Sequence, residues 1–373
     1  MNIRNSFLVF LCIFCVAQPC ALLAVQKSLP ASSFERLNYS FAGKEFEEPY
    51  WGMTKGDLNG DGVKQWVLLA RNSIVVGDFE NEKFVSAAQC SWKGDAQGGR
   101  VYAYDIDGDG DDEIIISAVS FAKPASVILN FKNGRCEELM TNIPYSLRVV
   151  KGKEGFIGQS WSSSDYFFGK IFKLGVEKNK LKRAGSMVLP WLTYLYDFDI
   201  FETADEGLYC ILQKGIDYLE LRKKTGRKFK RMWRSPDKFG GSINQIFAPS
   251  RAVLGSDTGE FVTFPTAPVY LATGENLRVI AIHHDMPVKG IIGLKTFIRG
   301  SEAVIFRFDW ALGFIEEART DFLPGAAVDM YIDEGGDGAF SIYILTVSGG
   351  GFLGQATGSR IFRFDRKSTP PGK

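Results

Sequence analysis

The chain has 373 residues, of which 45% are hydrophobic and 23% charged, a balance typical of a globular protein that buries a core. Its 44 basic and 43 acidic residues give a formal net charge of +1, which argues against a nucleic-acid partner or a general attraction to charged surfaces. The counts of 40 glycines and 30 phenylalanines are high and indicate short aromatic-rich strands separated by tight turns.

Residues 1–24 are predicted to be a secretory signal peptide. Arg4 precedes an apolar stretch over 7–16 that is short for a membrane span, and small residues follow it. Cleavage after Ala24 or Ala21 would remove one basic residue and bring the net charge to zero. No later run is long and apolar enough to span a bilayer, so we expect an exported protein, periplasmic or extracellular, without a membrane span after cleavage. An uncleaved N-terminal anchor is the alternative.

The cysteines outside this segment are Cys90, Cys136 and Cys210. An odd number of scattered cysteines without a CxxC pair indicates neither a disulfide framework nor a zinc site. One pair could form a disulfide after export, and the sequence does not select which.

A short acidic or glycine-containing turn between strand-like runs recurs with a period of about 45 residues. The units begin near residues 57, 105, 150, 197, 245, 288 and 329. Each offers about four short strands, and no helical periodicity persists. Units of this kind are typical of β-propeller blades, which bury both faces by packing around a ring. We therefore predict an all-β fold, a seven-bladed β-propeller of about 45-residue, four-stranded repeats over residues 45–366. A β-sandwich, or two stacked β domains, is the alternative.

The ends of the chain carry no repeat unit of their own. Residues 25–44 are predicted to form an N-terminal segment, and FERLNYSFAG or EPYWGM could supply the strand that completes the last blade. Its partner would be RIFRFD, residues 360–365. We expect residues 367–373 to form a disordered tail.

The second unit contains YDIDGDGDDEIII, in which oxygen donors recur at alternate positions. Asp105, Asp107 and Asp109 occupy positions 1, 3 and 5, and a glycine takes the sharp turn at position 6. Asp111 can offer its backbone carbonyl from position 7, and Glu113 its carboxylate from position 9. Oxygen ligands of this kind match Ca²⁺. Isoleucine at position 12 and β-branched flanks exclude an EF-hand, so we predict a calcium-binding hairpin turn, with a metal-free Asx turn as the alternative.

The first unit has a poorer version of the same loop. Asp57, Asn59 and Asp61 take positions 1, 3 and 5, Val63 offers its carbonyl from position 7, and Gln65 stands at position 9. With two carboxylates in place of four, we expect weaker calcium binding here.

Two later segments depart further from the pattern. The loop that contains Asp333 and Asp337 is degenerate, because Gly335 stands at position 3 and Ser341 at position 9. The segment at Asp197 lacks the turn glycine, and we interpret it as vestigial.

The pattern D-x-[DN]-x-D-G-x-x-[DE] opening a β run resembles the FG-GAP/VCBS repeats of integrin-α-like β-propellers, and within that group it is similar to secreted bacterial propellers. The resemblance covers about residues 45–365 and includes WGMTKGDLNGDG and WRSPDKFGGS. It implies a binding or scaffold role without a known ligand. The calcium ligands that it implies are Asp57, Asn59, Asp61, Asp105, Asp107, Asp109 and Glu113.

The sequence shows no arrangement that favours catalysis. The only two histidines, His283 and His284, are adjacent, and we interpret them as loop residues at a blade end before Pro287. Neighbours on a strand would point to opposite faces and could not share a metal. Neither a GxSxG motif nor a phosphate-binding glycine loop with lysine is present. We therefore predict that the protein is not an enzyme.

The function that we expect is that of an exported, calcium-stabilised, monomeric binding or scaffold protein whose loops contact an unknown protein or glycan partner. Candidate contacts are Trp161, Tyr166, Phe167 and Phe168, with packing between blades as the alternative. A structural component of a cell-envelope assembly is the second interpretation. A propeller hydrolase or lyase is the third.

Overall fold

The computed structural model describes residues 34–152, 155–162, 166–177, 180–203, 207–214, 218–249, 259–273, 276–286, 298–309, 311–335, 338–348 and 356–367. These residues belong to one compact unit that begins at Phe34. The predicted signal peptide and residues 368–373 of the predicted tail lie outside the described residues. Within the described part of the chain, no helix has the length and apolar character that a membrane crossing requires.

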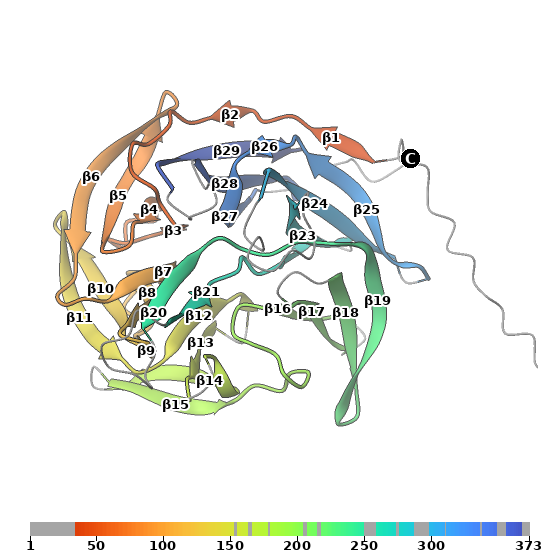
Figure 1. Ribbon diagram of the computed structural model, residues 1–373, viewed down its shortest axis with the longest axis horizontal. Helices are drawn as coiled ribbons and strands as arrows, with labels where there is room; N and C mark the ends of the chain where they lie inside the picture. Colours follow the sequence, from red (N-terminus) through yellow and green to blue (C-terminus); the bar gives the residue numbers. More distant parts are fainter. Residues whose placement is uncertain are drawn as a thin grey trace, which may run out of the picture. The chain divides into compact units, whose positions relative to one another are not determined.

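The described residues form mainly antiparallel sheets set around a common axis, the architecture of a β-propeller (Figure 1). Each blade begins with its innermost strand. The first blade contains β3 (Gly52–Gly56), β4 (Gln65–Leu69), β5 (Ser73–Glu80) and β6 (Lys83–Ser91). The second contains β7 (Gln97–Tyr104), β8 (Glu113–Ser120), β9 (Lys123–Pro124), β10 (Ser126–Lys132) and β11 (Arg135–Ile143). The third contains β12 (Ser146–Val150), β13 (Gly155–Ser160), β14 (Phe168–Glu177) and β15 (Lys180–Ser186).

The remaining three blades include strands from the N-terminal segment. The fourth blade contains β16 (Phe198–Glu202), β17 (Leu208–Gln213), β18 (Tyr218–Thr225) and β19 (Lys228–Lys238). The fifth contains β22 (Val269–Thr273), β23 (Asn276–Asp285), β24 (Gly300–Asp309) and β25 (Gly313–Thr320), with β1 (Glu35–Leu37) and β26 (Leu323–Pro324). The sixth contains β27 (Ala326–Glu334), β28 (Phe340–Ser348) and β29 (Gly358–Arg366), with β2 (Phe41–Ala42).

The β-propeller architecture is confirmed, but the predicted number of blades is wrong, because the described residues form six blades and not seven. The unit expected near residue 245 is only a two-stranded hairpin of β20 (Gln245–Pro249) and β21 (Gly259–Thr263). A two-stranded hairpin is too small to form a blade that packs against a neighbour on each side. Its apolar residues instead pack into the cluster between the third and fourth blades. The fifth blade already begins at β22, and Val288, where a further unit was expected to start, lies outside the described residues.

The core consists, among the described residues, of six apolar clusters, one between each pair of neighbouring blades. Strand β8 shows how the sequence builds two of them. Ile114 and Ile116 pack toward the first blade, whereas Ile115 packs toward the third. Because successive side chains of a strand point to opposite faces, an uninterrupted apolar run supplies both interfaces of its blade.

The ring is closed by the N-terminal segment. Strand β1 pairs in parallel with β25 at the outside of the fifth blade, and β2 pairs antiparallel with β29 of the sixth. Within the second pair, Phe41 lies opposite Arg363 and Ala42 opposite Phe362. The chain then enters β3, so one continuous segment connects the fifth, sixth and first blades.

The cysteine pair that the sequence left open is Cys90–Cys136. Cys90 lies on β6 and Cys136 on β11, so the disulfide joins the outer strands of the first and second blades. Cys210 is free and buried in the fourth blade.

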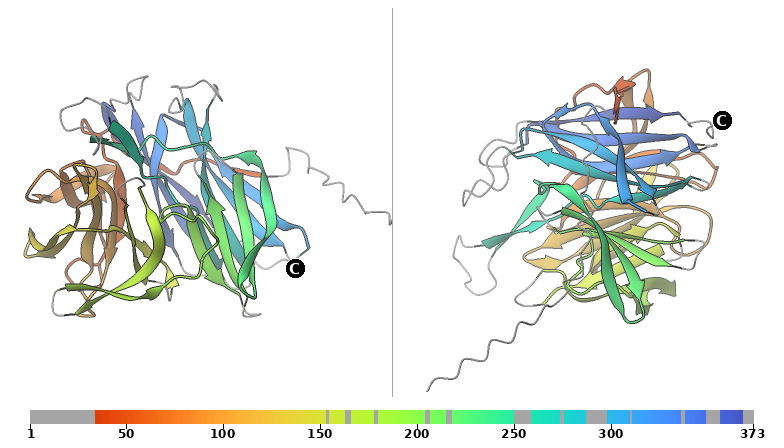
Figure 2. Two further views of the ribbon diagram at one scale, coloured as in Figure 1. Left: turned by 60° about the horizontal axis from the view of Figure 1, so that its bottom comes forward. Right: turned by 90° about the vertical axis from the view of Figure 1, so that its right-hand side faces the viewer.

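The β20–β21 hairpin stands out from one end of the ring, and the segments that flank it enter the ring axis (Figure 2). The Asn244 side chain donates to the carbonyl of Trp51 at 3.0 Å and to that of Gly99 at 2.7 Å. The backbone carbonyl of Asn244 accepts from the amide of Phe264 at 2.8 Å. Arg71 donates to the Asn244 side chain at 2.9 Å and to the carbonyl of Gln245 at 2.9 Å. We call residues 239–249 and 259–268 the plug, because they cover this end of the axis.

The plug predicts a steric effect at Gly99. A Cβ atom there would lie 2.6 Å from the ring of Phe264, which is fully buried, so Gly99→Ala is expected to destabilise the protein by about 1–3 kcal/mol. Gly175→Ala is the control, because no atom lies within 4 Å of its added Cβ. Denaturant unfolding of both variants measures the difference, and equal stabilities would contradict the described packing of the plug.

Candidate functional sites: an acidic turn, an aromatic face and an axial pocket

The predicted calcium loop of the second blade is the turn between β7 and β8. The side chains of Asp105, Asp107 and Asp109 converge there, with one carboxylate oxygen of each within 4.8 Å of the others. The two Asp105 oxygens fold the turn by accepting from the amides of Gly108 at 2.6 Å and Gly110 at 3.1 Å. Gly110 has a φ of 97°, a conformation that favours glycine.

Glu113 supplies the observation that tests whether a metal fits. Its side chain is fully buried, and its Oε2 accepts from the amide of Ile106 at 3.0 Å. Its Oε1 is buried without a hydrogen-bond partner. Burial, opposed by the Ile106 amide and reinforced by the charges of Asp107, Asp109 and Asp105, raises the pKa of Glu113 to about 7. Calcium prefers oxygen ligands, so the chemistry of these residues fits it. Of the predicted side-chain ligands, Asp105, Asp107 and Asp109 converge, whereas Glu113 lies outside that group of three with its buried Oε1 unpaired.

The corresponding loop of the first blade closes by hydrogen bonds of its own. Asp57 accepts from the amides of Asp61 at 3.1 Å and Gly62 at 2.8 Å. Gln65 Oε1 accepts from the amide of Leu58 at 3.1 Å, as Glu113 Oε2 does from Ile106.

The two loops differ at the second polar atom of the position-9 side chain, which is Nε2 in Gln65 and Oε1 in Glu113. Gln65 Nε2 donates to the carbonyl of Val63, at position 7, at 2.6 Å. In the second loop this atom is the unpartnered Oε1 of Glu113, which cannot donate. The amide nitrogen of Gln65 thus satisfies the carbonyl that a cation would otherwise coordinate. Asn59 also uses its amide within the loop, donating to Asp61 at 2.9 Å.

The loops of the two blades contact each other through a residue that the sequence analysis did not select. Asp112 accepts from the amide of Asp57 at 2.8 Å and donates its own amide to the Asp57 carbonyl at 2.7 Å. A Cβ atom on Gly60 would lie 2.3 Å from Oδ1 of Asp111, so the second loop packs directly on the first. The turn of the second blade therefore packs on that of the first and is hydrogen-bonded to it.

In the part of the other two acidic segments that the structure describes, no comparable turn is formed. Asp333 ends an inner strand and lies 3.4 Å from the ammonium group of Lys55, whereas Asp337 lies outside the described residues. Asp197 is buried just before β16, where it accepts weakly from the amide of Tyr194 at 3.4 Å.

The aromatic contacts predicted from the sequence divide into two groups. Phe167 is buried, and Trp161 and Tyr166 are partly buried against the cluster that holds it, so these three support packing between blades. Phe168 is 55% exposed.

A larger exposed aromatic surface lies beside Phe168, and the sequence analysis missed it. Its other members come from the connection between the third and fourth blades and from the plug. We call it the aromatic face: Phe168, Trp191, Leu192, Tyr194, Phe247 and Phe261. Trp191 is 85% exposed.

Two hollows connect these residues into one surface. A cavity of about 740 Å³ is lined by Phe168, Trp191, Leu192 and Tyr194, and a second of about 380 Å³ by Tyr194 and Phe261. Phe247 and Phe261 pack edge to face with their centroids 5.5 Å apart. Lys214 holds the connection by donating to the carbonyl of Leu192 at 2.7 Å.

The backbone at this face is strained. Leu192 has a φ of 55°, and Phe167, beneath the face, has a φ of 56°. Bulky residues rarely adopt this left-handed conformation, and such residues cluster at binding sites. The stretch LPWLTYLYD, residues 189–197, places three aromatic residues between strands, which is the signal that could have identified the face.

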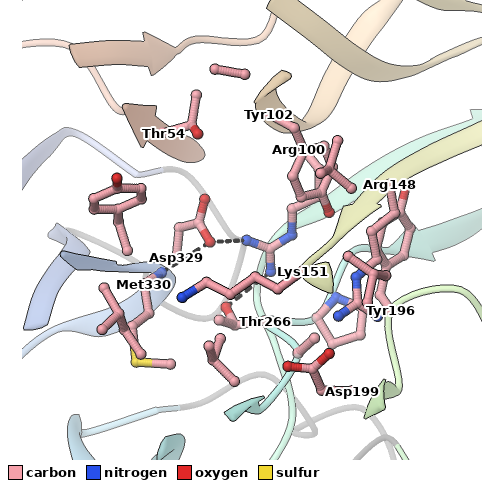
Figure 3. A pocket seen from close by; sticks show the side chains of 18 of the residues that line it. Thr54, Arg100, Tyr102, Arg148, Lys151, Tyr196, Asp199, Thr266, Asp329 and Met330 are labelled. Atoms are coloured by element: carbon pink, nitrogen blue, oxygen red, sulfur yellow. Dashed lines mark hydrogen bonds and ion pairs between the residues drawn. The ribbon is translucent and has the colours of Figure 1, made fainter. Parts of the chain in front are cut away.

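A third candidate site is an axial pocket of about 230 Å³ at the centre of the ring (Figure 3). It is lined by the innermost strands and is covered at the plug end by Pro265, Thr266 and Ala267. Arg100 Nη1 donates to Asp329 at 2.6 Å and to the carbonyl of Val328 at 3.0 Å. Its Nη2 donates to the carbonyl of Phe264 at 2.9 Å and to Thr266 at 2.9 Å.

The charged residues of this pocket were not predicted from the sequence, although their positions on the innermost strands give a repeated signal. Innermost strands of five blades each place one charged residue on the pocket, within a run that is otherwise mostly apolar or small-residue. These residues are Lys55, Arg100, Arg148, Asp199 and Asp329.

The histidines lie on β23 and not in a loop, so that part of the interpretation is wrong. His283 Nδ1 lies 3.2 Å from Glu302 Oε1, whereas His284 is buried with Nδ1 2.8 Å from the Ser301 hydroxyl. Burial, together with the neighbouring His283, lowers the pKa of His284 to about 3. The two side chains thus have separate partners within the fifth blade.

No protein-family model and no curated protein matches the chain. A chain in the "Crystal Structure of Mitotic Checkpoint Complex" is similar at 10% identity and a TM-score of 0.45, with 95% of this chain and 98% of that chain covered. A chain in the crystal structure of S. cerevisiae core factor is similar at 8% identity and a TM-score of 0.37, with 88% and 48% covered. Likeness at this level carries no functional argument, and the β-propeller assignment rests on the sheets of this chain.

Asp197, which lines the smaller hollow of the aromatic face, predicts a pH effect on stability. Burial raises its pKa to about 7, against opposing effects of the Tyr194 amide, Lys214 and Arg148. An acid whose pKa is raised by folding binds its proton more tightly in the folded state, so its contribution to stability falls as pH rises from about 4 to about 7.

We expect Asp197→Asn to remove that decline, because asparagine carries no charge to bury. Melting temperatures of the wild type and the variant across this pH range provide the measurement. Parallel pH profiles for the two proteins would show that Asp197 titrates normally.

Proposed function

We propose that the protein is an exported, non-catalytic binding protein that uses the plug end of its ring to bind a protein partner. The aromatic face carries this proposal. Exposed aromatic residues beside strained backbone are typical of recognition surfaces, and loops at the end of a rigid ring are suited to present them.

A protein partner is favoured over a glycan by the composition of the face. Trp191, Tyr194 and Phe261 could stack on sugar rings, but Leu192 and the neighbouring Val188 are exposed aliphatic residues at the same surface. Aliphatic side chains match the apolar centre of a protein interface, whereas a glycan presents many hydroxyl groups that need polar partners. A structural role in a cell-envelope assembly is the alternative, and it would use the same face.

We further propose that calcium bound by the loop 105–113 stabilises the first two blades. The ligands would be Asp105, Asp107, Asp109, the Asp111 carbonyl and Glu113. Bound there, calcium would neutralise the converged carboxylates and satisfy Glu113 Oε1. These loops also support membership of the FG-GAP/VCBS propellers. For Asp57, Asn59, Asp61 and Val63 calcium binding stays a prediction, and the hydrogen bonds of Gln65 favour a loop that closes without it.

The difference at position 9 of the two loops predicts that exchanging glutamate and glutamine there changes calcium dependence in opposite directions. In Glu113→Gln, the new amide can donate to the Asp111 carbonyl, so the calcium-dependent rise in melting temperature should disappear. With chelator present, this variant should be more stable than the wild type by about 1–3 kcal/mol, because a buried unpaired oxygen has been removed. Gln65→Glu should instead increase the calcium dependence.

Thermal unfolding of the three proteins, with chelator and with calcium restored, measures these effects. If Glu113→Gln leaves the calcium-dependent rise in melting temperature unchanged, the ion binds elsewhere, and the proposed stabilisation by calcium at the loop 105–113 is contradicted.

The aromatic face predicts a localised contact in cells that produce the protein. A photo-crosslinking residue at Val188, which lines the larger hollow, should form an adduct with one protein. The same residue at Leu312, which is 68% exposed in the turn between β24 and β25, should not. With the purified partner, Trp191→Ser should weaken binding roughly 30-fold while the melting temperature is unchanged.

Identical adducts at both positions, or binding unaffected by Trp191→Ser, would contradict the proposed face. Binding of purified glycans that is lost in Trp191→Ser would replace the protein partner with a carbohydrate.

A further inference from the structure

The axial pocket contains a buried cation without a matching anion. Arg148 lies on β12, is 5% exposed and lines the pocket (Figure 3). Its Nη1 donates to the carbonyl of Leu195 at 2.8 Å, and its guanidinium carbon lies 4.9 Å from the centre of the Phe198 ring. Guanidinium has five N–H donors, and the described residues provide Arg148 with this one hydrogen bond and no carboxylate ion pair.

The other cations of the pocket are paired. Arg100 has four acceptors and an ion pair with Asp329. Lys55 pairs with Asp333 and Lys151 with Glu334. Arg148 is therefore the cation of the described pocket that no carboxylate contacts.

Asp199 lines the same pocket and could balance Arg148, but its oxygens have other partners. Oδ1 accepts from the amide of Ile200 at 3.0 Å, and Oδ2 accepts from the amide of Tyr270 at 3.0 Å. Its charge acts on Arg148 through space, without a hydrogen bond between the two groups. A buried charge that lacks a direct partner is unfavourable, which indicates that an anion completes this site.

The other residues that line the pocket indicate which chemical class of anion fits it. The Tyr102 side chain faces the pocket, and no described residue accepts a hydrogen bond from its hydroxyl. Burial raises the pKa of Tyr102 to about 12, so the hydroxyl keeps its proton at neutral pH and can donate. Val269, Met330 and Ile332 add an apolar wall. A fully polar anion such as phosphate would face this wall with unsatisfied oxygens.

We propose that the axial pocket binds a small organic carboxylate. Its carboxylate accepts hydrogen bonds from the unused N–H groups of Arg148 and from the Tyr102 hydroxyl, and its apolar body lies against Val269, Met330 and Ile332. The volume of about 230 Å³ limits the ligand to a small molecule. The plug covers one end of the pocket, so the ligand enters from the end that carries the acidic turns. This site is separate from the aromatic face and does not depend on the partner proposed for it.

Calorimetry with the full purified chain tests the proposal. The probes are acetate, butyrate, hexanoate and benzoate at millimolar concentration, each compared with its neutral amide and with inorganic phosphate. At least one carboxylate should bind with one site per chain, and its amide should not. Arg148→Met should weaken that binding roughly 10- to 100-fold, because a charge-assisted hydrogen bond is lost. Arg183→Met, at an exposed arginine of β15, is the matched control and should leave it unchanged.

Tyr102→Phe gives a second test that does not depend on the folding of Arg148→Met. Loss of one hydrogen bond from the hydroxyl to the ligand's carboxylate should weaken carboxylate binding roughly 10-fold. Failure of all four carboxylates to bind, equal binding of an acid and its amide, or phosphate binding alone would overturn the proposal. Carboxylate binding that neither pocket variant weakens would also overturn it.

Discussion

The ion pair between Arg100 and Asp329 is the interaction on which the interior of the ring depends. Arg100 lies on the innermost strand of the second blade and Asp329 on that of the sixth, and Asp329 also accepts from the amide of Met53 in the first blade at 2.9 Å. The same guanidinium binds Phe264 and Thr266 of the plug. Three blades and the plug thus meet at one buried pair. Removal of either partner would leave a buried charge without compensation, which is strongly destabilising.

This arrangement gives the two ends of the ring different properties. At the plug end, Phe264 is buried at the axis, whereas Phe247 and Phe261, also of the plug, are exposed. One short segment therefore supplies both buried and exposed aromatic side chains. At the opposite end, the inner strands pass into the acidic turns, where Asp57 and Asp112 join the first two blades. The Cys90–Cys136 disulfide joins these blades again at the rim. The interface between them is therefore reinforced independently at the turn and at the outer strands.

The sequence predicted the class of fold because its repeats are encoded locally: an apolar run such as β8 fills both interfaces of a blade, whichever blades are its neighbours. The number of blades depends on longer-range contacts. The segment near residue 245 has the period and strand pattern of a repeat, and only its contacts with Gly99 and the axis show that it is a plug. The turns at Asp57 and Asp105 were identified as loops from their spacing, but the difference between Gln65 and Glu113 depends on which atom meets which carbonyl. Trp191 was overlooked because exposure is a property of the folded surface.

Native-state hydrogen exchange of the plug tests most directly the claim that the plug is anchored on the ring axis as an integral part of the fold. The amide of Phe264, bound to the Asn244 carbonyl, and those of Ile246 and Val262 in the hairpin stem should exchange as slowly as the amides of β8. That result would show that the plug opens only together with the blades. Exchange of these amides as fast as that of an exposed loop, with β8 still protected, would contradict the account, because the plug would then be an appendage of a ring that is stable without it.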